Sequence, residues 1–283
     1  MVIEMQEKEV QRSAQIISFM GANYVAREVG YHMTGGWGEG DSASNAYFQP
    51  IETFAQRFDQ LLGQIRSLGF RALDLWMAHL NWQWATSEHI TIATQLLTKH
   101  QLTVTSLAGF FGSTREEFEA TCRIATAVGT NILGGGTALL ESDRPTTVAT
   151  LKHYGVKLAL ENHPQEKTAR DMLSKIGDGA DGSIGTAIDT GWYATNGYDA
   201  VRAIEELAGS IIHVHLKDVL APGAHETCRY GRGCVDIPSC IQALRHIGYD
   251  GAYSIEHEPE LFDPSEDCVA MLAQLHAWLR NPA

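Results

Sequence analysis

The chain has 283 residues, and its 34 aspartates and glutamates outnumber its 21 lysines and arginines, which gives a formal net charge of −13. This charge repels phosphate backbones and anionic membranes, which argues against nucleic acid as a partner. The hydrophobic content of 44% allows a large core, but the sequence has no run of roughly 18 apolar residues that would cross a bilayer. The length matches one closed α/β barrel, so we expect a single domain over residues 1–283.

Two further features favour a cytoplasmic protein. Residues 1–15 carry glutamates and a lysine where a secretory leader needs a basic start and then an apolar stretch, so no leader is expected. The five cysteines are odd in number and include no C-x-x-C pair, which predicts neither a disulfide framework nor a zinc knuckle.

Short apolar segments alternate with longer amphipathic ones along the chain, a pattern typical of strand–helix units around a parallel sheet. About eight such units are present, which predicts a single (β/α)8 TIM barrel of the α/β class. The expected strands are residues 16–25, 71–77, 102–110, 131–135, 156–162, 184–189, 211–216 and 252–258. The expected helices are residues 51–67, 87–100, 114–128, 199–208 and 264–279.

Two stretches depart from this alternation. Residues 32–50 are dense in Gly, Ser, Asp and aromatics and predict a long first βα loop that acts as a lid or binding loop. A disordered surface excursion is the alternative. Residues 139–153 leave room for only a short fourth helix, so the barrel wall would be thin there. A thin wall at these residues would be either a surface for a partner subunit or the result of a simple deletion.

Four of the expected strands end in ionisable residues although the strands themselves read as buried. These ends are L-A-L-E-N-H with Glu161, I-D-T-G with Asp189, H-V-H-L-K-D with His215 and S-I-E-H-E-P with Glu256. In parallel barrels the C-terminal strand ends form the active site. Neighbouring buried carboxylates repel each other unless a cation lies between them, and this mostly oxygen-bearing set favours Mn²⁺, with Mg²⁺ or Co²⁺ as alternatives. For any single acid, a structural ion pair is the competing interpretation.

Strand geometry separates two nearby histidines. Side chains alternate along a strand, so His213, His215 and Lys217 share one face. His215 lies nearer the mouth and is the better metal ligand, whereas His213 is expected to be a packed, hydrogen-bonded histidine one layer deeper.

The motifs between residues 156 and 259 carry a resemblance to a known family. L-A-L-E-N-H, I-D-T-G, H-V-H-L-K-D, G-R-G-x-x-D-I-P and S-I-E-H-E-P follow one another in the order found in the xylose isomerase-like barrel superfamily. This sugar phosphate isomerase/epimerase group also includes keto-sugar 3-epimerases, inosose dehydratases and AP endonucleases. The resemblance implies that Glu161, Asp189, His215 and Glu256 bind one divalent metal ion. It also implies that Glu161 and Glu256 act as acid/base groups on opposite sides of the substrate.

The sequence departs from the keto-sugar epimerases of this group at two positions. Trp192 stands three residues after Asp189, where those enzymes resemble one another in carrying a substrate-contacting histidine. The arginine that they place soon after the metal histidine is missing, because residues 219–222 read V-L-A-P. Both departures argue against simple 3-epimerase activity and favour a larger or differently oxidised substrate.

A second set of residues is expected to bind the substrate. His163, Lys217 and Glu258 would hold hydroxyls or tune the ligands, although a structural salt bridge is equally open for Lys217. Arg232, in the loop with Gly231 and Gly233, would reach over the site unless it is simply solvated. Aromatic residues expected near the mouth include Trp37, Trp76, Trp82, Phe110, Phe111, Trp192 and Tyr193, some of them in the core. Such rings stack on sugars and on aryl groups alike, and we assign Trp37 and Trp192 to substrate binding.

These observations predict a metal-dependent isomerase or epimerase that abstracts a proton next to a carbonyl of a small sugar or sugar derivative, through an enediolate. The alternative is a lyase or dehydratase that acts on a keto-sugar, keto-inositol or keto-glycoside with the same bases. An AP endonuclease would need more histidines and a basic face. A non-catalytic sugar-binding barrel would not need four intact ligands. A homo-oligomer is expected.

Overall fold

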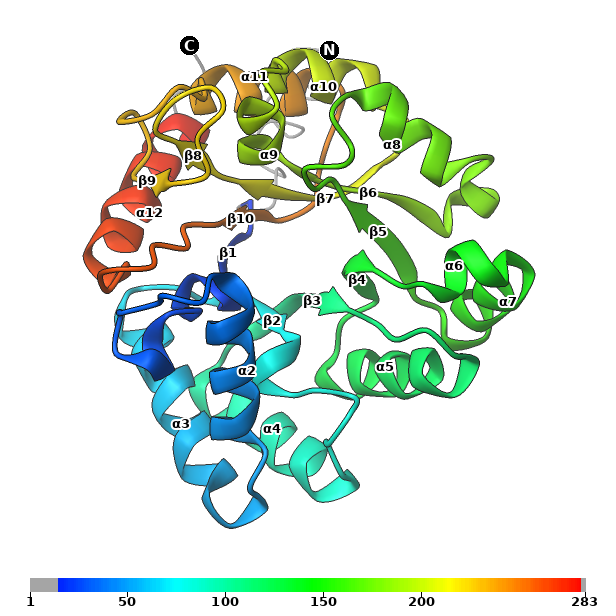
Figure 1. Ribbon diagram of the computed structural model, residues 1–283, viewed down its shortest axis with the longest axis vertical. Helices are drawn as coiled ribbons and strands as arrows, with labels where there is room; N and C mark the ends of the chain where they lie inside the picture. The colour runs from blue at the N-terminus through cyan, green and yellow to red at the C-terminus, as the bar shows by residue number, and fades with distance from the viewer. Residues whose placement is uncertain (1–14, 281–283) are drawn as a thin grey trace, which may run out of the picture.

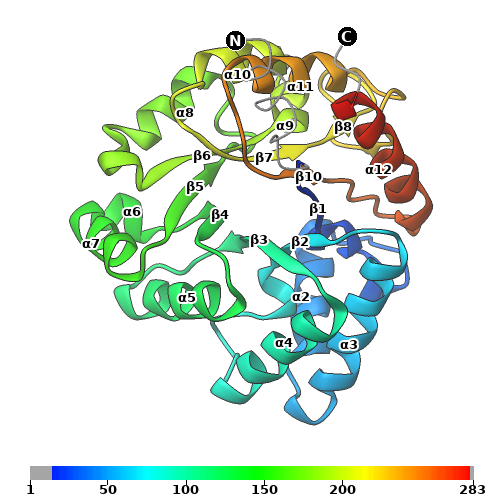
Figure 2. The same ribbon diagram turned by 180° about the vertical axis from the view of Figure 1, so that it is seen from behind.

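The computed structural model describes residues 15–280. Residues 1–14, which belong to the segment where no secretory leader was expected, lie outside the described residues. Eight parallel strands close into a barrel in the order β1-β10-β7-β6-β5-β4-β3-β2, as the topology predicted from the sequence requires. Helices surround this ring of strands, as the two opposite views show (Figures 1 and 2). The barrel strands are β1 (Ile17–Met20), β2 (Ala72–Trp76), β3 (Thr103–Phe110), β4 (Ile132–Gly136), β5 (Lys157–Glu161), β6 (Ile184–Asp189), β7 (Ile211–Leu216) and β10 (Tyr253–Ile255).

The helices fall on the outside of the barrel and at its rim. The α-helices are α2 (Trp37–Phe48), α3 (Ile51–Ser67), α4 (Ser87–His100), α5 (Arg115–Val128), α6 (Leu139–Ser142), α7 (Arg144–Tyr154), α8 (Ala169–Ile176), α9 (Thr190–Thr195), α10 (Ala200–Glu206), α11 (Ile237–His246) and α12 (Ser265–Arg280). Short 3-10 helices are η1 (Gly21–Tyr24), η2 (Arg27–Val29), η3 (Met77–His79) and η4 (Gly179–Gly182). Within residues 15–280, none of these helices combines the length and apolar character that a membrane span needs.

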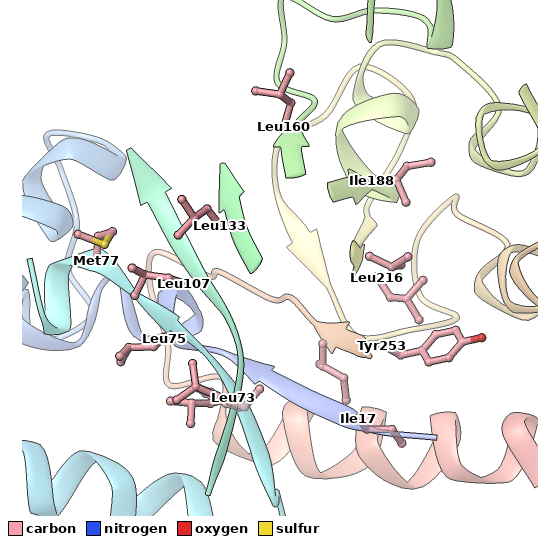
Figure 3. Close-up of a cluster of buried hydrophobic side chains, with 14 of the residues drawn as sticks. Ile17, Leu73, Leu75, Met77, Leu107, Leu133, Leu160, Ile188, Leu216 and Tyr253 are labelled. Carbon is pink, nitrogen blue, oxygen red and sulfur yellow. The ribbon is translucent and has the colours of Figure 1, made fainter. Parts of the chain in front are cut away.

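The main core lies between the strands and the helices. Outward-facing strand residues such as Leu73, Leu107 and Leu133 are fully buried and belong to one continuous apolar cluster (Figure 3). The inward face of the barrel is different, because it carries small or polar residues that include Ser18 and Ser106. Strand alternation therefore separates an apolar outer layer from a polar centre.

The first strand is shorter than predicted. β1 ends at Met20, and residues 21–24 form η1 where the strand was expected to continue to Val25. Gly21 passes so close to β2 that a Cβ there would lie 2.9 Å from Cβ of Trp76. The chain therefore turns across the end of β2 instead of extending the sheet.

Residues 32–50, expected to be a loop, contain helix α2. Gly40, Ser44 and Phe48 are its buried residues, and their four-residue spacing places them on one helix face. Because two of these three contact residues are glycine and serine, the apolar periodicity that normally announces a helix was hidden.

The fourth helical layer is longer than predicted. Residues 139–154 form α6 and then α7, which has 11 residues and packs against α5. Asp143 caps α7 by accepting a hydrogen bond from the backbone N–H of Thr146 at 3.1 Å. Thr147 and Thr150 lie on its buried face, so polar residue types concealed part of the helix, and α7 is shorter than α3, α4 and α5.

A small two-stranded hairpin, β8 (Asp218–Val219) with β9 (Thr227–Cys228), follows β7. It lies beside α12 in both views (Figures 1 and 2). The hairpin was not predicted, since each of its strands has only two residues.

Candidate active site

The four predicted ligands lie at the same end of four neighbouring strands. Glu161 is the last residue of β5, and Asp189 is the last residue of β6. His215 is the penultimate residue of β7, and Glu256 directly follows β10. These strands are consecutive in the barrel. Asp189, His215 and Glu256 are buried, and Glu161 is partly buried. The side chains are therefore held in an environment that screens charge poorly.

Glu161, His215 and Glu256 form a compact group. Nδ1 of His215 lies 2.9 Å from Oε1 of Glu161 and 2.9 Å from Oε2 of Glu256. One nitrogen or oxygen atom from each residue lies within 4.8 Å of the others, so a single ion can contact all three. Burial alone would raise the pKa of the Glu161 carboxyl, but His215 beside it lowers that pKa below its ordinary value. Two carboxylates thus converge on one nitrogen of the imidazole.

Asp189 is oriented differently. As the cap of α9, its Oδ1 accepts hydrogen bonds from the backbone N–H groups of Gly191 at 2.7 Å and Trp192 at 3.2 Å. Its Oδ2 accepts one from Nζ of Lys217 at 3.1 Å. Burial raises the pKa of Asp189 to about 6, against the opposing effect of Lys217. Asp189 therefore adjoins the compact group of three without belonging to it.

Lys217 supplies positive charge among three carboxylates. Its Nζ lies 3.1 Å from Oδ2 of Asp189 and 3.1 Å from Oε2 of Glu258, and it also contacts Oε1 of Glu256. Burial by itself lowers the pKa of the Lys217 ammonium, but these carboxylates raise it well above the ordinary value. Burial also raises the pKa of Glu258, to about 7. The ammonium thus faces oxygens that the sequence assigned to a metal ion.

The charges as well as the spacing fit a divalent cation. When ionised, the carboxylates of Glu161, Asp189, Glu256 and Glu258 outnumber the cationic groups beside them, even if His215 is protonated. Oε2 of Glu256 is a buried oxygen that accepts no hydrogen bond from the residues that the structure describes, since Nδ1 of His215, 2.9 Å away, is hydrogen-bonded to Oε1 of Glu161. Oxygen and imidazole donors of this kind suit Mn²⁺, Mg²⁺ or Co²⁺. An added cation would relieve the repulsion between these groups.

Asp74, on β2, is a functional candidate that the sequence analysis missed. Its Oδ2 lies 2.9 Å from Nε2 of His213 and 3.7 Å from Nε2 of His215. Burial alone would raise the pKa of Asp74, but His213 and His215 lower it to about 2. This carboxylate is hydrogen-bonded to His213 and lies on the Nε2 side of the His215 ring, while Nδ1 of His215 faces Glu161. The only sequence signal was an acid within the apolar stretch A-L-D-L-W.

A cavity of about 1170 Å³ opens at this end of the barrel. One side of it, here called the charged half, comes from β5, β7 and the segment after β10. The other side, the apolar half, comes from the ends of β1 to β4 and from the start of α2. The charged half includes Glu161, His163, Lys217, Glu256 and Glu258. The apolar half includes Met20, Trp37, Trp76, Phe110, Gly135 and Gly136.

Five of the six predicted substrate-binding residues line this cavity. His163, Lys217 and Glu258 do so on the charged side, where the ring of Trp192 lies 5.2 Å from Nζ of Lys217. Trp37 lines it from α2 and donates a hydrogen bond from Nε1 to Oε1 of Glu258 at 3.2 Å. The indole of Trp37 therefore connects the two halves of the cavity.

Arg232 is the predicted residue that the structure does not bring to the cavity. It is exposed, and it is not among the cavity-lining residues. The backbone N–H groups of Gly231 and Gly233 each donate to Oδ2 of Asp218 at 3.1 Å. This buried carboxylate thus anchors the backbone of the loop that carries Arg232. Of the aromatics expected near the mouth, Phe111 and Tyr193 are fully buried in the core.

Comparison with known proteins identifies the family. A family model described as a xylose isomerase-like TIM barrel matches residues 62–281. The chain belongs to this family. Its relatives include the L-ribulose-5-phosphate 3-epimerase UlaE of Escherichia coli, which is 36% identical over 82 residues. That alignment covers 29% of this chain and 28% of the relative, so the chain spans less than a third of that enzyme's length.

Solved structures share the barrel of this xylose isomerase-like protein. A D-allulose 3-epimerase from Methylomonas sp., in complex with D-allulose, has a TM-score of 0.64 at 14% identity, over 93% of this chain and 96% of that one. The probable 3-DHS dehydratase AsbF of Bacillus anthracis has a TM-score of 0.62 at 16% identity, over 95% and 100%. At these identities the likeness establishes the fold.

Proposed function

We propose that this xylose isomerase-like protein is a divalent-metal-dependent isomerase or epimerase of a sugar or sugar derivative. The observation that carries the proposal is the convergence of Glu161 and Glu256 on Nδ1 of His215, each with a carboxylate oxygen 2.9 Å from that atom. Two carboxylates so placed can remove a proton from carbon and return one. The family and the printed activity of UlaE support a sugar as substrate.

Glu161, His215 and Glu256 would hold the ion, with Asp189 as the fourth ligand. We expect Mn²⁺ first, with Mg²⁺ or Co²⁺ as alternatives. When bound, such an ion polarises a carbonyl and makes the adjacent C–H acidic. For Asp189 to join the other ligands, its Oδ2 must be shared with or released by Nζ of Lys217, which now lies 3.1 Å away.

Different residues of the chain would transfer the proton and bind the substrate hydroxyls. One carboxylate, Glu161 or Glu256, takes the proton from the carbon next to the carbonyl, and the other returns a proton on the opposite side or at the adjacent carbon. Lys217 and Glu258 lie beside Glu256 and are placed to bind substrate hydroxyls. His163 is placed to do the same beside Glu161, with Nε2 3.7 Å from Oε2.

Solvent isotope exchange tests the proposal. The metal-loaded protein is incubated in D₂O with a panel of keto-sugars, and deuterium in the substrate and product is measured by mass spectrometry and NMR. We expect exchange of one carbon-bound hydrogen with conservation of the sugar skeleton. Glu161→Gln and Glu256→Gln should lower exchange at least 100-fold, because each removes an acid/base group.

Matched controls make the outcome decisive. Glu205→Gln changes an exposed glutamate of α10 in the same way and should retain wild-type exchange. Circular dichroism should show that all three variants keep the barrel. Full exchange in either active-site variant would refute the acid/base assignment.

A lyase is the second candidate, and the apolar half of the cavity favours it. A wall that includes Trp37, Trp76 and Phe110 has room for an apolar leaving group beside the carboxylates. The same bases would then expel a substituent β to a ketone. Such a reaction yields an enone or two fragments, whereas an isomerase conserves mass, so mass spectrometry of the same incubations separates the two activities.

We also expect a cytoplasmic homo-oligomer. Light scattering coupled to size-exclusion chromatography measures the oligomeric state directly.

A further inference from the structure

The cavity is chemically divided along the barrel. The charged half carries the carboxylates and the ammonium described above. By contrast, the lining residues at the ends of β1 to β4 are uncharged, and they include Met20, Trp76, Ala108, Gly109 and Gly136. Beyond β4, Glu141 of α6 and Arg144 of α7 add charges to the lining. A free sugar bears hydroxyl groups around its whole ring, so it would match the charged half and leave the apolar half in contact with water.

The apolar wall is a built feature of the fold. Met20 and Trp76 are almost fully buried and belong to an apolar cluster separate from the main core, together with Met33 and other residues at the barrel mouth. The ring of Trp37 lies 5.5 Å from that of Trp76 at an angle of 66°. This cluster fixes one side of the cavity independently of the barrel core.

Two aromatic side chains of this wall remain open to solvent. Trp37 is 45% exposed and Phe110 is 53% exposed, although both line the cavity. Leaving a large apolar side chain partly in water forgoes burial free energy. A ligand group that covers these rings would recover part of that free energy.

Glycines form the floor between these rings. β3 and β4 approach so closely that a Cβ on Gly135 would lie 2.0 Å from the carbonyl oxygen of Gly109, and Gly135 also has a φ of +147°. Next to it, a Cβ on Gly136 would meet no atom within 4 Å, so this residue opens into free space. At Gly109, Gly135 and Gly136 the cavity is lined by backbone without side chains, against which a planar ring can lie.

The volume agrees with a substrate of more than one part. Pockets for drug-sized ligands measure about 300–1,000 Å³, and this cavity, at about 1170 Å³, is larger. Because the two halves form one continuous space, bridged by the hydrogen bond from Trp37 to Glu258, a single molecule can contact both.

We propose that the apolar half is a subsite for a flat, apolar group that is covalently joined to the sugar-like part of the substrate, so that the substrate class is an aryl glycoside or a similar aryl conjugate. This inference builds on the proposed function, which places the sugar-like part in the charged half. The aryl group lies on the glycine floor between Trp37, Trp76 and Phe110.

Binding of matched ligand pairs tests the subsite. Methyl and phenyl β-glycosides of glucose, galactose and xylose lack a carbonyl and are not turned over by proton transfer, so isothermal titration calorimetry on the metal-loaded protein reports binding alone. In at least one pair, the phenyl glycoside should bind 10-fold or more tightly than the methyl glycoside. Equal or undetectable affinities in all three pairs would overturn the proposal.

Two variants locate the phenyl group. Gly136→Leu fills the open space above the floor and should abolish the preference for phenyl over methyl while changing affinity for the methyl glycoside less than twofold. Gly209→Leu is the matched control, because a Cβ there also meets no atom within 4 Å and Gly209 lies outside the cavity. Phe110→Ala, at an exposed side chain, should reduce the preference at least threefold.

The outcomes distinguish this inference from the proposed function. If keto-sugars exchange deuterium and no aryl preference exists, the subsite is wrong and the proposed function stands. If the aryl preference is found without any deuterium exchange, the subsite stands and the proposed function is wrong. A preference for phenyl over methyl that persists in both Gly136→Leu and Phe110→Ala would place the aryl group elsewhere. A change of oligomeric state in Phe110→Ala would make this wall an interface instead of a subsite.

Discussion

Lys217 carries the largest mechanistic consequence of any single residue in the site. Its ammonium lies against Asp189 and Glu256, two of the four predicted metal ligands, and against Glu258. A sequence motif places this lysine on the same strand face as His215, but the motif does not say which oxygens the ammonium contacts. A metal ion held by the predicted ligands would therefore draw on the same carboxylates as Lys217.

We therefore predict that Lys217→Met binds Mn²⁺ more tightly than the wild type, by about 10-fold, because the competing cation is gone and the carboxylates are left without a partner. Isothermal titration calorimetry on the EDTA-treated protein measures the Kd. Lys175→Met is the control, since Lys175 lines the same cavity but pairs with Glu166. Unchanged or weaker Mn²⁺ binding in Lys217→Met would contradict the competition.

A second single-residue prediction concerns pH. His79 is buried between the rings of Phe48 and Trp76, and burial lowers its pKa from 6.5 to about 3. Below pH 6.5 the unfolded chain takes up a proton that the folded chain refuses until about pH 3. The stability associated with this residue is therefore complete above pH 6.5 and declines as the pH falls towards 3.

The expected loss of unfolding free energy between pH 7.5 and pH 5 from this residue is about 2 kcal/mol, since each pH unit below 6.5 corresponds to about 1.4 kcal/mol. His79→Phe should remove this part of the pH dependence, as measured by urea unfolding at the two pH values. His153→Phe, at an exposed histidine, should keep the wild-type dependence. An identical loss in wild type and His79→Phe would show that His79 does not titrate as described.

At the scale of elements, helix α2 positions Trp37 over the cavity. The helix packs onto the η1–η2 region through Gly40, where a Cβ would lie 2.2 Å from the carbonyl oxygen of Val25 and 2.9 Å from Sδ of Met33. Such an approach is possible only for glycine. The residue that weakens the helix by its flexibility is thus the one that docks it.

Gly40→Ala should destabilise the protein by about 1–3 kcal/mol, because the added methyl group forces α2 away from Val25. It should also increase solvent quenching of Trp37 fluorescence. Gly38→Ala, in the same helix, meets no atom within 4 Å, and it should be neutral or stabilising by up to about 1 kcal/mol. Urea unfolding of both variants is the measurement. Equal stabilities would show that α2 is not held at Gly40.

The barrel elements were predicted more accurately than the segments at its rim. α3 and α4 begin and end at the expected residues, because their apolar spacing and their flanking residues are strong local signals. α2 and α7 bury glycine, serine or threonine, and these residue types give no hydrophobic period to detect. The strands β8 and β9 were missed because two residues are too few to show an alternating pattern.

On the scale of the whole molecule, the site joins four strands from the C-terminal half of the chain around an excess of negative charge. A cation that binds only the folded barrel stabilises it by mass action. At a free Mn²⁺ concentration of 100 times the Kd, the gain in unfolding free energy is about 2.7 kcal/mol. This gain should raise the thermal midpoint by about 5–10 °C relative to the EDTA-treated protein.

Differential scanning calorimetry with and without Mn²⁺ checks this prediction. Glu256→Gln should lose most of the shift, because one donor of the group of three is weakened. Glu205→Gln, the exposed control, should retain it. The same midpoint in EDTA and in Mn²⁺ would refute a metal site in the folded barrel.

The sequence by itself determined the eight-stranded barrel and the end of it at which Glu161, Asp189, His215 and Glu256 lie, because the alternation of strand and helix segments and the position of a residue at the end of a strand are local properties of the chain. Only the tertiary structure decided what each of these groups contacts. Asp74 reaches His213 across 139 positions of the chain, and Asp218 holds Arg232 away from the cavity by binding its loop. Such pairings depend on which strands become neighbours and on how closely they pack, and no repeating pattern in the sequence encodes that.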